Sequence, residues 1–200
     1  MEVSDLQDEL KYFDNLIFDL FKPGEVIIAG GAFTKVFTGQ RPNDIDLFFK
    51  TEELALAAVT LIKSKNLKVT FENDWVTNFK YKGQKCQIVK KYFAPSLETI
   101  IDQFDFTVCK FAYDGKDIAY NKRFFKDLAK SRLVIDGVLL KPLNTLKRSY
   151  KYISRGFTIC PIGLGKLARA INALEIDWDN PDQNTIDFYP DGGPTFRGID

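Results

Sequence analysis

The chain has 200 residues, of which 45% are hydrophobic and 28% charged, and its formal net charge is +1. This length and composition are typical of one globular core, or of one core with a small appendage. The sequence contains no histidine, which excludes histidine-based triads, histidine general bases and histidine-ligated zinc. Catalysis would therefore depend on carboxylates, Lys, Tyr, Cys or a metal ion held by oxygen.

The near-zero net charge conceals an uneven distribution along the chain. Residues 110–170 carry 14 basic and 4 acidic side chains, whereas residues 171–200 carry 1 basic and 7 acidic ones. The basic segment is compatible either with a surface that faces a polyanion or with a solvated helical face.

The three cysteines form no CxxC pair, and the acidic, amphipathic N-terminus does not resemble a signal peptide. No apolar run approaches the roughly 20 residues that cross a bilayer. We therefore expect a cytoplasmic protein without a membrane partner, and the composition is compatible with a phage-encoded or bacterial origin.

Alternating helix and strand patterns occupy the first two thirds of the chain. Apolar spacing predicts helices over residues 4–21, 32–39, 52–64 and 96–103. Strands are predicted over residues 25–29, 44–49, 67–72, 74–81, 85–93 and 104–113, with 116–120 pairing back as a hairpin.

Helical patterns then dominate, over residues 121–130, from Pro142 to about Ser154, and from Pro161 to about Leu174. This order predicts an α/β fold of the α+β type, a mixed sheet flanked by helices and followed by a short helical part. We divide it into a head (1–138), a helical extension (139–176) and an irregular acidic tail (177–200).

Two aspartates, Asp44 and Asp46, lie one residue apart on a predicted strand. Side chains at positions i and i+2 of a strand point to the same face, so the two carboxylates repel each other unless a cation lies between them. Mg²⁺ prefers such oxygen ligands. A bare Asp-x-Asp is also common at a solvent-exposed strand end.

Upstream, Gly30 and Gly31 separate an apolar strand from a helix, where backbone N–H groups can approach a phosphate. Together, the segments IIAGG and DIDLFF resemble the signature of the DNA-polymerase-β-like nucleotidyltransferase superfamily. Within it, the chain is most similar to the head domain of CCA-adding enzymes and bacterial poly(A) polymerases. Thr34 and Lys35 replace the Arg-Asp pair of that family, and Lys35 or Arg41 could compensate for the lost arginine. The candidate nucleotide-binding residues are therefore Gly30, Gly31, Thr34, Lys35 and Arg41.

The superfamily requires a third carboxylate on a later strand, and Asp105 is the best candidate because it is a lone charge in an apolar segment. A strand-end aspartate that caps a turn or faces solvent is the alternative.

The segment 141–157 resembles the neck helix of the same family, and the matching residues are Pro142, Leu143, Leu146, Arg148, Gly156 and Phe157. Its basic residues are the candidate acceptor-binding residues, namely Lys147, Arg148, Lys151 and Arg155. Arg148 is equally compatible with packing and pairing against the head.

The resemblance implies transfer of a nucleoside monophosphate from an NTP to a hydroxyl, with release of pyrophosphate, assisted by two Mg²⁺ or Mn²⁺ ions bound by Asp44, Asp46 and Asp105. The acceptor would be an RNA or DNA 3′ end, a protein or a small molecule. The alternative is an inactive head that serves as a binding or assembly module. The sequence indicates neither the nucleotide nor the oligomeric state.

Overall fold

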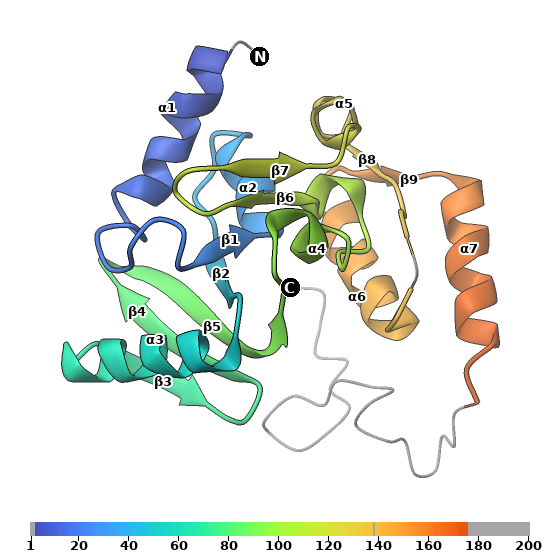
Figure 1. The fold of residues 1–200 in the computed structure, drawn as a ribbon. Coiled ribbons are helices and arrows are strands. Elements are labelled where there is room, and N and C mark those ends of the chain that lie inside the picture. The colour runs from blue at the N-terminus through green and yellow to red at the C-terminus, as the bar shows by residue number, and fades with distance from the viewer. Residues whose placement is uncertain (1–2, 138, 176–200) are drawn as a thin grey trace.

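The computed structural model describes residues 3–137 and 139–175, and its centre is a seven-stranded mixed sheet (Figure 1). The strands are β1 (Ile27–Ala29), β2 (Asp44–Phe49), β3 (Lys68–Glu72), β4 (Val76–Tyr81), β5 (Gln84–Phe93), β6 (Phe111–Tyr113) and β7 (Ile118–Tyr120). Their order in the sheet is β3-β4-β5-β2-β1-β6-β7. Only β2 and β5 pair in parallel, and all other neighbours are antiparallel. The predicted α/β class is therefore confirmed.

Short helices connect and cover the strands. They are α1 (Val3–Asp14), α2 (Gly31–Val36), α3 (Glu52–Ser64), α4 (Leu97–Ile101), the 3₁₀ helix η1 (Thr107–Cys109) and α5 (Phe124–Ala129). Thr51 and Ser96 begin α3 and α4 as N-caps, each accepting a hydrogen bond from a backbone N–H three residues later.

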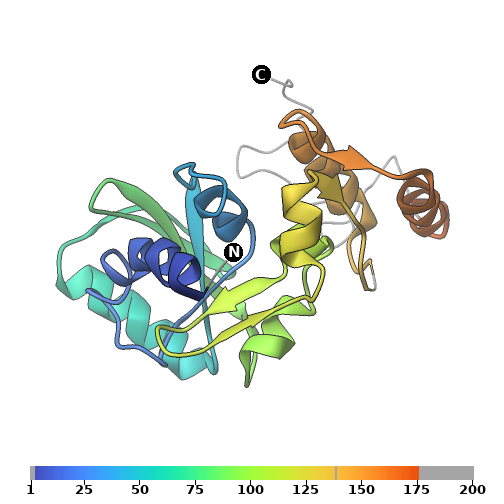
Figure 2. The same cartoon turned by 90° about the horizontal axis from the view of Figure 1, so that it is seen from above.

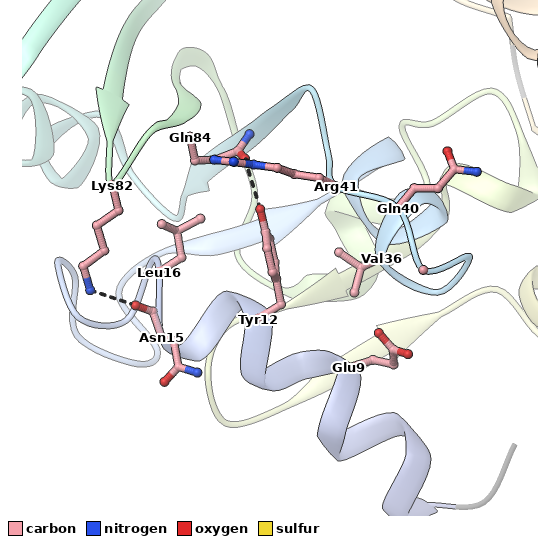
Figure 3. A pocket seen from close by; sticks show the side chains of 10 residues that line it. Glu9, Tyr12, Asn15, Leu16, Val36, Gln40, Arg41, Lys82 and Gln84 are labelled. Atoms are coloured by element: carbon pink, nitrogen blue, oxygen red, sulfur yellow. Dashed lines mark hydrogen bonds between the residues drawn. The ribbon is translucent and has the colours of Figure 1, made fainter.

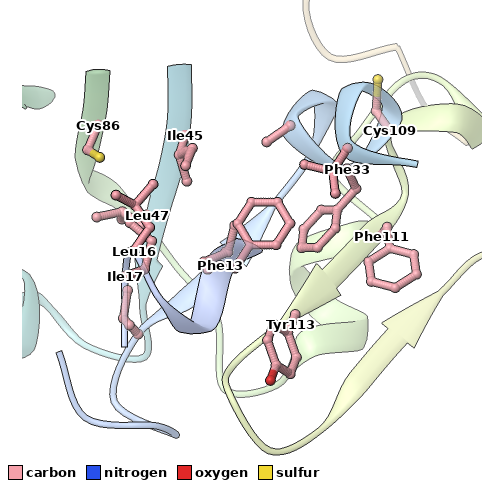
Figure 4. Packing of buried hydrophobic residues seen from close by; sticks show 14 of the residues in the cluster. Phe13, Leu16, Ile17, Phe33, Ile45, Leu47, Cys86, Cys109, Phe111 and Tyr113 are labelled. Atoms are coloured by element: carbon pink, nitrogen blue, oxygen red, sulfur yellow. The ribbon is translucent and has the colours of Figure 1, made fainter. Parts of the chain in front are cut away.

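The larger hydrophobic core gathers side chains from α1, α2, α3 and one face of the sheet. Phe13, Phe33 and Phe111 meet at its centre, with ring centroids 4.5–4.6 Å apart between neighbours (Figure 4). A smaller core under α4 contains Ile27, Phe48 and Ile100. Strand β2 lies between the two cores.

The C-terminal part consists of α6 (Pro142–Ile153) and α7 (Pro161–Asn172). Figure 2 shows both helices to one side of the sheet, with α7 outermost. A two-stranded parallel sheet of β8 (Arg132–Leu133) and β9 (Thr158–Ile159), which the sequence did not indicate, joins the chain before α6 to the chain after it. The predicted acidic tail (177–200) lies outside the described residues.

Two predicted elements were wrong in extent. The first helix ends at Asp14 instead of continuing to residue 21, because the chain tightens into turns in which Leu16 N–H bonds Phe13 O. Leu16, Ile17 and Leu20 are nevertheless buried. The apolar spacing therefore predicted correctly which side chains are buried, but it did not predict the backbone conformation of residues 15–21.

The predicted strand 104–113 is a strand only from Phe111 onward. Asp105 lies in a bend, and the 3₁₀ helix η1 follows it. Residues 105–113 are all buried. The alternation of polar and apolar side chains in this segment therefore does not correspond to one buried and one solvent-exposed face. Alternation alone therefore did not identify a pleated strand.

Candidate nucleotide site

The carboxylate pair lies on β2, at the middle of the sheet. Ile45 and Leu47 are completely buried in the larger core, so Asp44 and Asp46, which alternate with them along the strand, project from the opposite face. Asp44 is exposed and Asp46 is partly exposed. The sequence-based placement of both aspartates on one face of a strand is consistent with this geometry.

Asp46 is the electrostatically strained member of the pair. Burial raises its pKa to about 7, and the neighbouring Asp44 contributes in the same direction. Lys151 and Arg148 of α6 lower the pKa, but their attraction does not outweigh burial and Asp44. A carboxylate in this condition gains free energy from a further cation.

The glycine turn lies beside this pair, because Ala29 of β1 is the register partner of Asp46. Gly30 has φ 93°, and a Cβ built on it would lie 2.8 Å from the ring of Phe104. Both facts require glycine. The N–H of Gly30 donates to Phe111 O at 3.1 Å, so it is already engaged and is not directed toward a ligand.

The basic residues of α6 face this region of the head. Lys151, which also acts on Asp46, and Arg155, just beyond the end of α6, lower the pKa of Lys35 on α2, although burial of Lys35 has the larger effect. Lys35 also donates to Gln40. The structure thus brings Lys35, Arg148, Lys151 and Arg155 to the space around α2 and β2. Lys147 is exposed on the same helix.

Two other predicted nucleotide-binding residues are engaged elsewhere. Thr34 is buried, and its hydroxyl donates to Val108 O at 2.5 Å. Arg41 donates through Nε to Gln84 Oε1 at 3.1 Å and lines a cavity of about 580 Å³ beside α1 (Figure 3). Neither Asp44 nor Asp46 lines that cavity.

Asp105 is not part of a three-carboxylate centre. Its Oδ2 accepts hydrogen bonds from Thr145 Oγ1 at 2.8 Å and from Arg148 Nη2 at 2.5 Å. Within residues 3–137 and 139–175, no three His, Cys, Asp or Glu side chains gather as a metal ion would require. The structure thus does not gather Asp44, Asp46 and Asp105 into one cluster, because Asp105 is bonded to α6. Their role in binding cations stays a prediction.

The pairing of Arg148 with the head was one of the two sequence-based alternatives, but sequence reasoning missed the contact that Tyr152 of α6 makes. Tyr152 is buried, its hydroxyl lies 3.0 Å from Cys109 Sγ, and a Cβ on Gly31 would lie 3.1 Å from the same hydroxyl. The available signal was the spacing of Thr145, Ser149 and Tyr152 on one face of an amphipathic helix.

Solved structures with a similar fold are tRNA-processing nucleotidyltransferases. The CCA-adding enzyme in complex with ATP matches with a TM-score of 0.58 and 18% identity, covering 86% of this chain and 44% of that chain. The Thermotoga maritima CCA-adding enzyme in complex with tRNA matches with a TM-score of 0.55 and 19% identity, covering 86% and 43%. These likenesses establish a nucleotidyltransferase-like fold. No helix in the described ranges is long and apolar enough to span a membrane.

A curated relative is "Gabija anti-defense 2" of Bacillus phage SPbetaL7, which is 31% identical over 150 residues, or 74% of this chain. The chain spans only 38% of the length of that relative. The sequence profile described as "Gabija anti-defense 2 family protein" matches residues 5–131, more than half of the chain. The chain therefore belongs to the Gabija anti-defense 2 family.

Proposed function

We propose that this chain is a phage nucleotidyltransferase that transfers a nucleoside monophosphate from an NTP to a hydroxyl acceptor, and that this transfer acts against the Gabija defence. The observation that carries the proposal is the arrangement around β2. Two carboxylates share one face of the strand, and Lys151 and Arg148 of α6 act on the same space. This combination suits a complex of a divalent cation with a triphosphate.

Asp44 and Asp46 fit a Mg²⁺ or Mn²⁺ site because Asp46 is held as a strained carboxylate, with its pKa raised to about 7 by burial and by Asp44. When bound, the ion would neutralise phosphate charge and favour ionisation of the attacking hydroxyl. This site requires only the two aspartates of β2, since Asp105 is bonded to α6.

The chain's own residues would bind and orient the nucleotide. Lys151 and Arg155, with Lys35 opposite, would attract the phosphates electrostatically. In the transfer, the acceptor oxygen bonds to the α-phosphorus, the bond from that phosphorus to the bridging oxygen breaks, and pyrophosphate leaves with the electron pair. The hydroxyl proton passes to solvent. The exposed Lys147 would contribute to binding of an RNA or DNA acceptor.

A second candidate function is a non-catalytic binding module with the same fold. The engaged N–H of Gly30 and the engaged hydroxyl of Thr34 favour it, because both remove donors that a triphosphate would use.

Label transfer separates the two functions. The protein is incubated with Mg²⁺ or Mn²⁺, each α-labelled NTP, and RNA, DNA or host-cell protein as the acceptor. Asp44→Asn/Asp46→Asn should abolish transfer, whereas Asp74→Asn, at an exposed aspartate between β3 and β4, should leave it unchanged. No transfer by the parent protein to any acceptor would favour the binding module.

The anti-defence role is tested by phage plating on bacteria that carry Gabija and express the chain. Rescue of plaque formation by the parent chain, and its loss in Asp44→Asn/Asp46→Asn, is the expected result. Rescue that survives the double substitution would separate the anti-Gabija effect from nucleotidyl transfer.

A further inference from the structure

Asp105 forms a buried, charge-assisted connection between the head and α6. The residue is 7% exposed, and both donors to its carboxylate come from one helix, three residues apart: Thr145, which is completely buried, and Arg148. Residues at this spacing lie on the same helical face. A buried carboxylate is costly unless it is paired and hydrogen-bonded, so the contact holds only while α6 remains in place.

The backbone of the same residue holds the segment that leads into α6. Asp136 N–H donates to Asp105 O at 2.9 Å, and Thr107 N–H donates to Val134 O at 3.0 Å. The Asp136 carboxylate in turn pairs with the buried Lys110 at 2.9 Å. Residues 105–110 therefore hold both the segment 134–136, which precedes α6, and Arg148 within α6.

The position of α6 matters to the carboxylate pair on β2. Ala29 of β1 is the register partner of Asp46, and Gly31 follows two residues later. Helix α6 docks on this glycine turn through the residue that follows Lys151. That residue, Tyr152, contacts Gly31 and Cys109. A shift of α6 would therefore change the distance between its cations and Asp46.

We propose that Asp105 is a positioning residue that acts through Arg148 and Thr145 to hold Lys151 of α6 opposite Asp44 and Asp46, and that it is not a metal ligand. The identity of the ligand between α6 and β2, an NTP with its divalent cation, rests on the proposed function. The pairing of Asp105 with Arg148 does not.

A double-mutant cycle of Asp105→Ala, Arg148→Ala and the double variant tests the pairing by thermal unfolding, without any need for activity. Arg148→Ala leaves the buried Asp105 carboxylate without its cationic partner, and Asp105→Ala removes the acceptor shared by the buried Thr145 and the half-exposed Arg148. Each single substitution should therefore lower the unfolding midpoint. The double variant should be no less stable than the worse single variant. Asp102→Ala, at an exposed aspartate three residues away, is the matched control and should leave the midpoint unchanged. Strictly additive losses would overturn the pairing.

Titration with a fluorescent ATP analogue and with Mn²⁺ tests the positioning role. Asp105→Ala should weaken binding of the analogue about tenfold. Asp105→Asn keeps an oxygen acceptor for both donors, so it should restore binding to within about threefold of the parent. Both variants should bind the same number of Mn²⁺ ions as the parent protein.

Three results would overturn the positioning role: unchanged binding of the analogue by Asp105→Ala, failure of Asp105→Asn to restore it, or loss of a bound Mn²⁺ ion in Asp105→Asn. Failure of the proposed function is distinguishable, because it would appear as absence of label transfer by the parent protein while the unfolding cycle still showed coupling.

Discussion

The carboxylates of Asp105 and Asp46 are both shielded from water, Asp105 almost fully and Asp46 partly, but within the described part of the chain only Asp105 has hydrogen-bond partners that satisfy it. At Asp105, Arg148 and Thr145 donate directly to the carboxylate, and the acid is satisfied within the protein. At Asp46, burial and Asp44 raise the pKa to about 7 despite the cations on α6. The difference supports our proposals that Asp105 positions α6 and that Asp44 and Asp46 bind a cation.

The largest expected effect is a contrast between the two sites in the rate of label transfer. Asp46→Asn should reduce transfer by at least about a thousandfold, because it removes a cation ligand from the reacting centre. Asp105→Asn should reduce it by no more than about threefold. Comparable losses in both variants, measured at saturating Mn²⁺ and NTP, would end the distinction between the sites.

The next effect concerns the contact between Gly30, which follows the register partner of Asp46, and Phe104, which precedes Asp105. Gly30→Ala should destabilise the protein by about 3 kcal/mol, since it places a Cβ against Phe104 at positive φ. Gly39→Ala is the matched control, because Gly39 also has positive φ but nothing within 4 Å of its Cβ. It should cost only about 1 kcal/mol. Equal losses in urea unfolding would show that Phe104 does not pack firmly on the turn.

The pH dependence of stability should reveal the strain at Asp46. Its pKa is about 7 in the folded state against 3.8 in the unfolded chain, so the unfolded state loses its proton first. The folded protein therefore loses stability as the pH rises from about 4 to 7, and the penalty is constant above that range.

Without metal, Asp46→Asn should consequently be more stable than the parent at pH 8, by about 2 kcal/mol after allowance for partial exposure. The advantage should disappear near pH 4. If the difference in free energy of unfolding between the parent and Asp46→Asn is the same at pH 4 and pH 8, the raised pKa of Asp46 is wrong.

The smallest effect concerns the cations of α6. Lys151→Ala should weaken binding of an ATP analogue about tenfold, because one favourable charge is lost near the phosphates. It should also flatten the salt dependence of binding. Lys166→Ala, at an exposed lysine on α7, provides the comparison and should change little. An equal effect of both substitutions would indicate only a loss of net charge.

The parts of this arrangement that sequence could predict are those encoded locally. Strand β1, the glycine turn and β2 follow directly from an apolar run, two glycines and strict alternation around Asp44 and Asp46. Helix α6 follows from Pro142 and its apolar spacing. These signals depend on neighbours in the chain.

Asp105 could not be assigned in the same way, because its role depends on a residue 43 positions away. A lone acid in an apolar segment needs a partner, and sequence supports a metal ion and an arginine equally well. The engagement of Arg41 by Gln84 and of Thr34 by Val108 is likewise a tertiary outcome that no local pattern records.

Binding of Mn²⁺ in the presence of a non-hydrolysable ATP analogue, followed by electron paramagnetic resonance, tests the central claim most directly. The account predicts that the parent protein and Asp105→Asn bind Mn²⁺ alike, and that Asp44→Asn/Asp46→Asn does not bind it above the level of free nucleotide. Mn²⁺ binding that persists in the double variant, or that disappears in Asp105→Asn, would contradict the assignment of the metal site to β2.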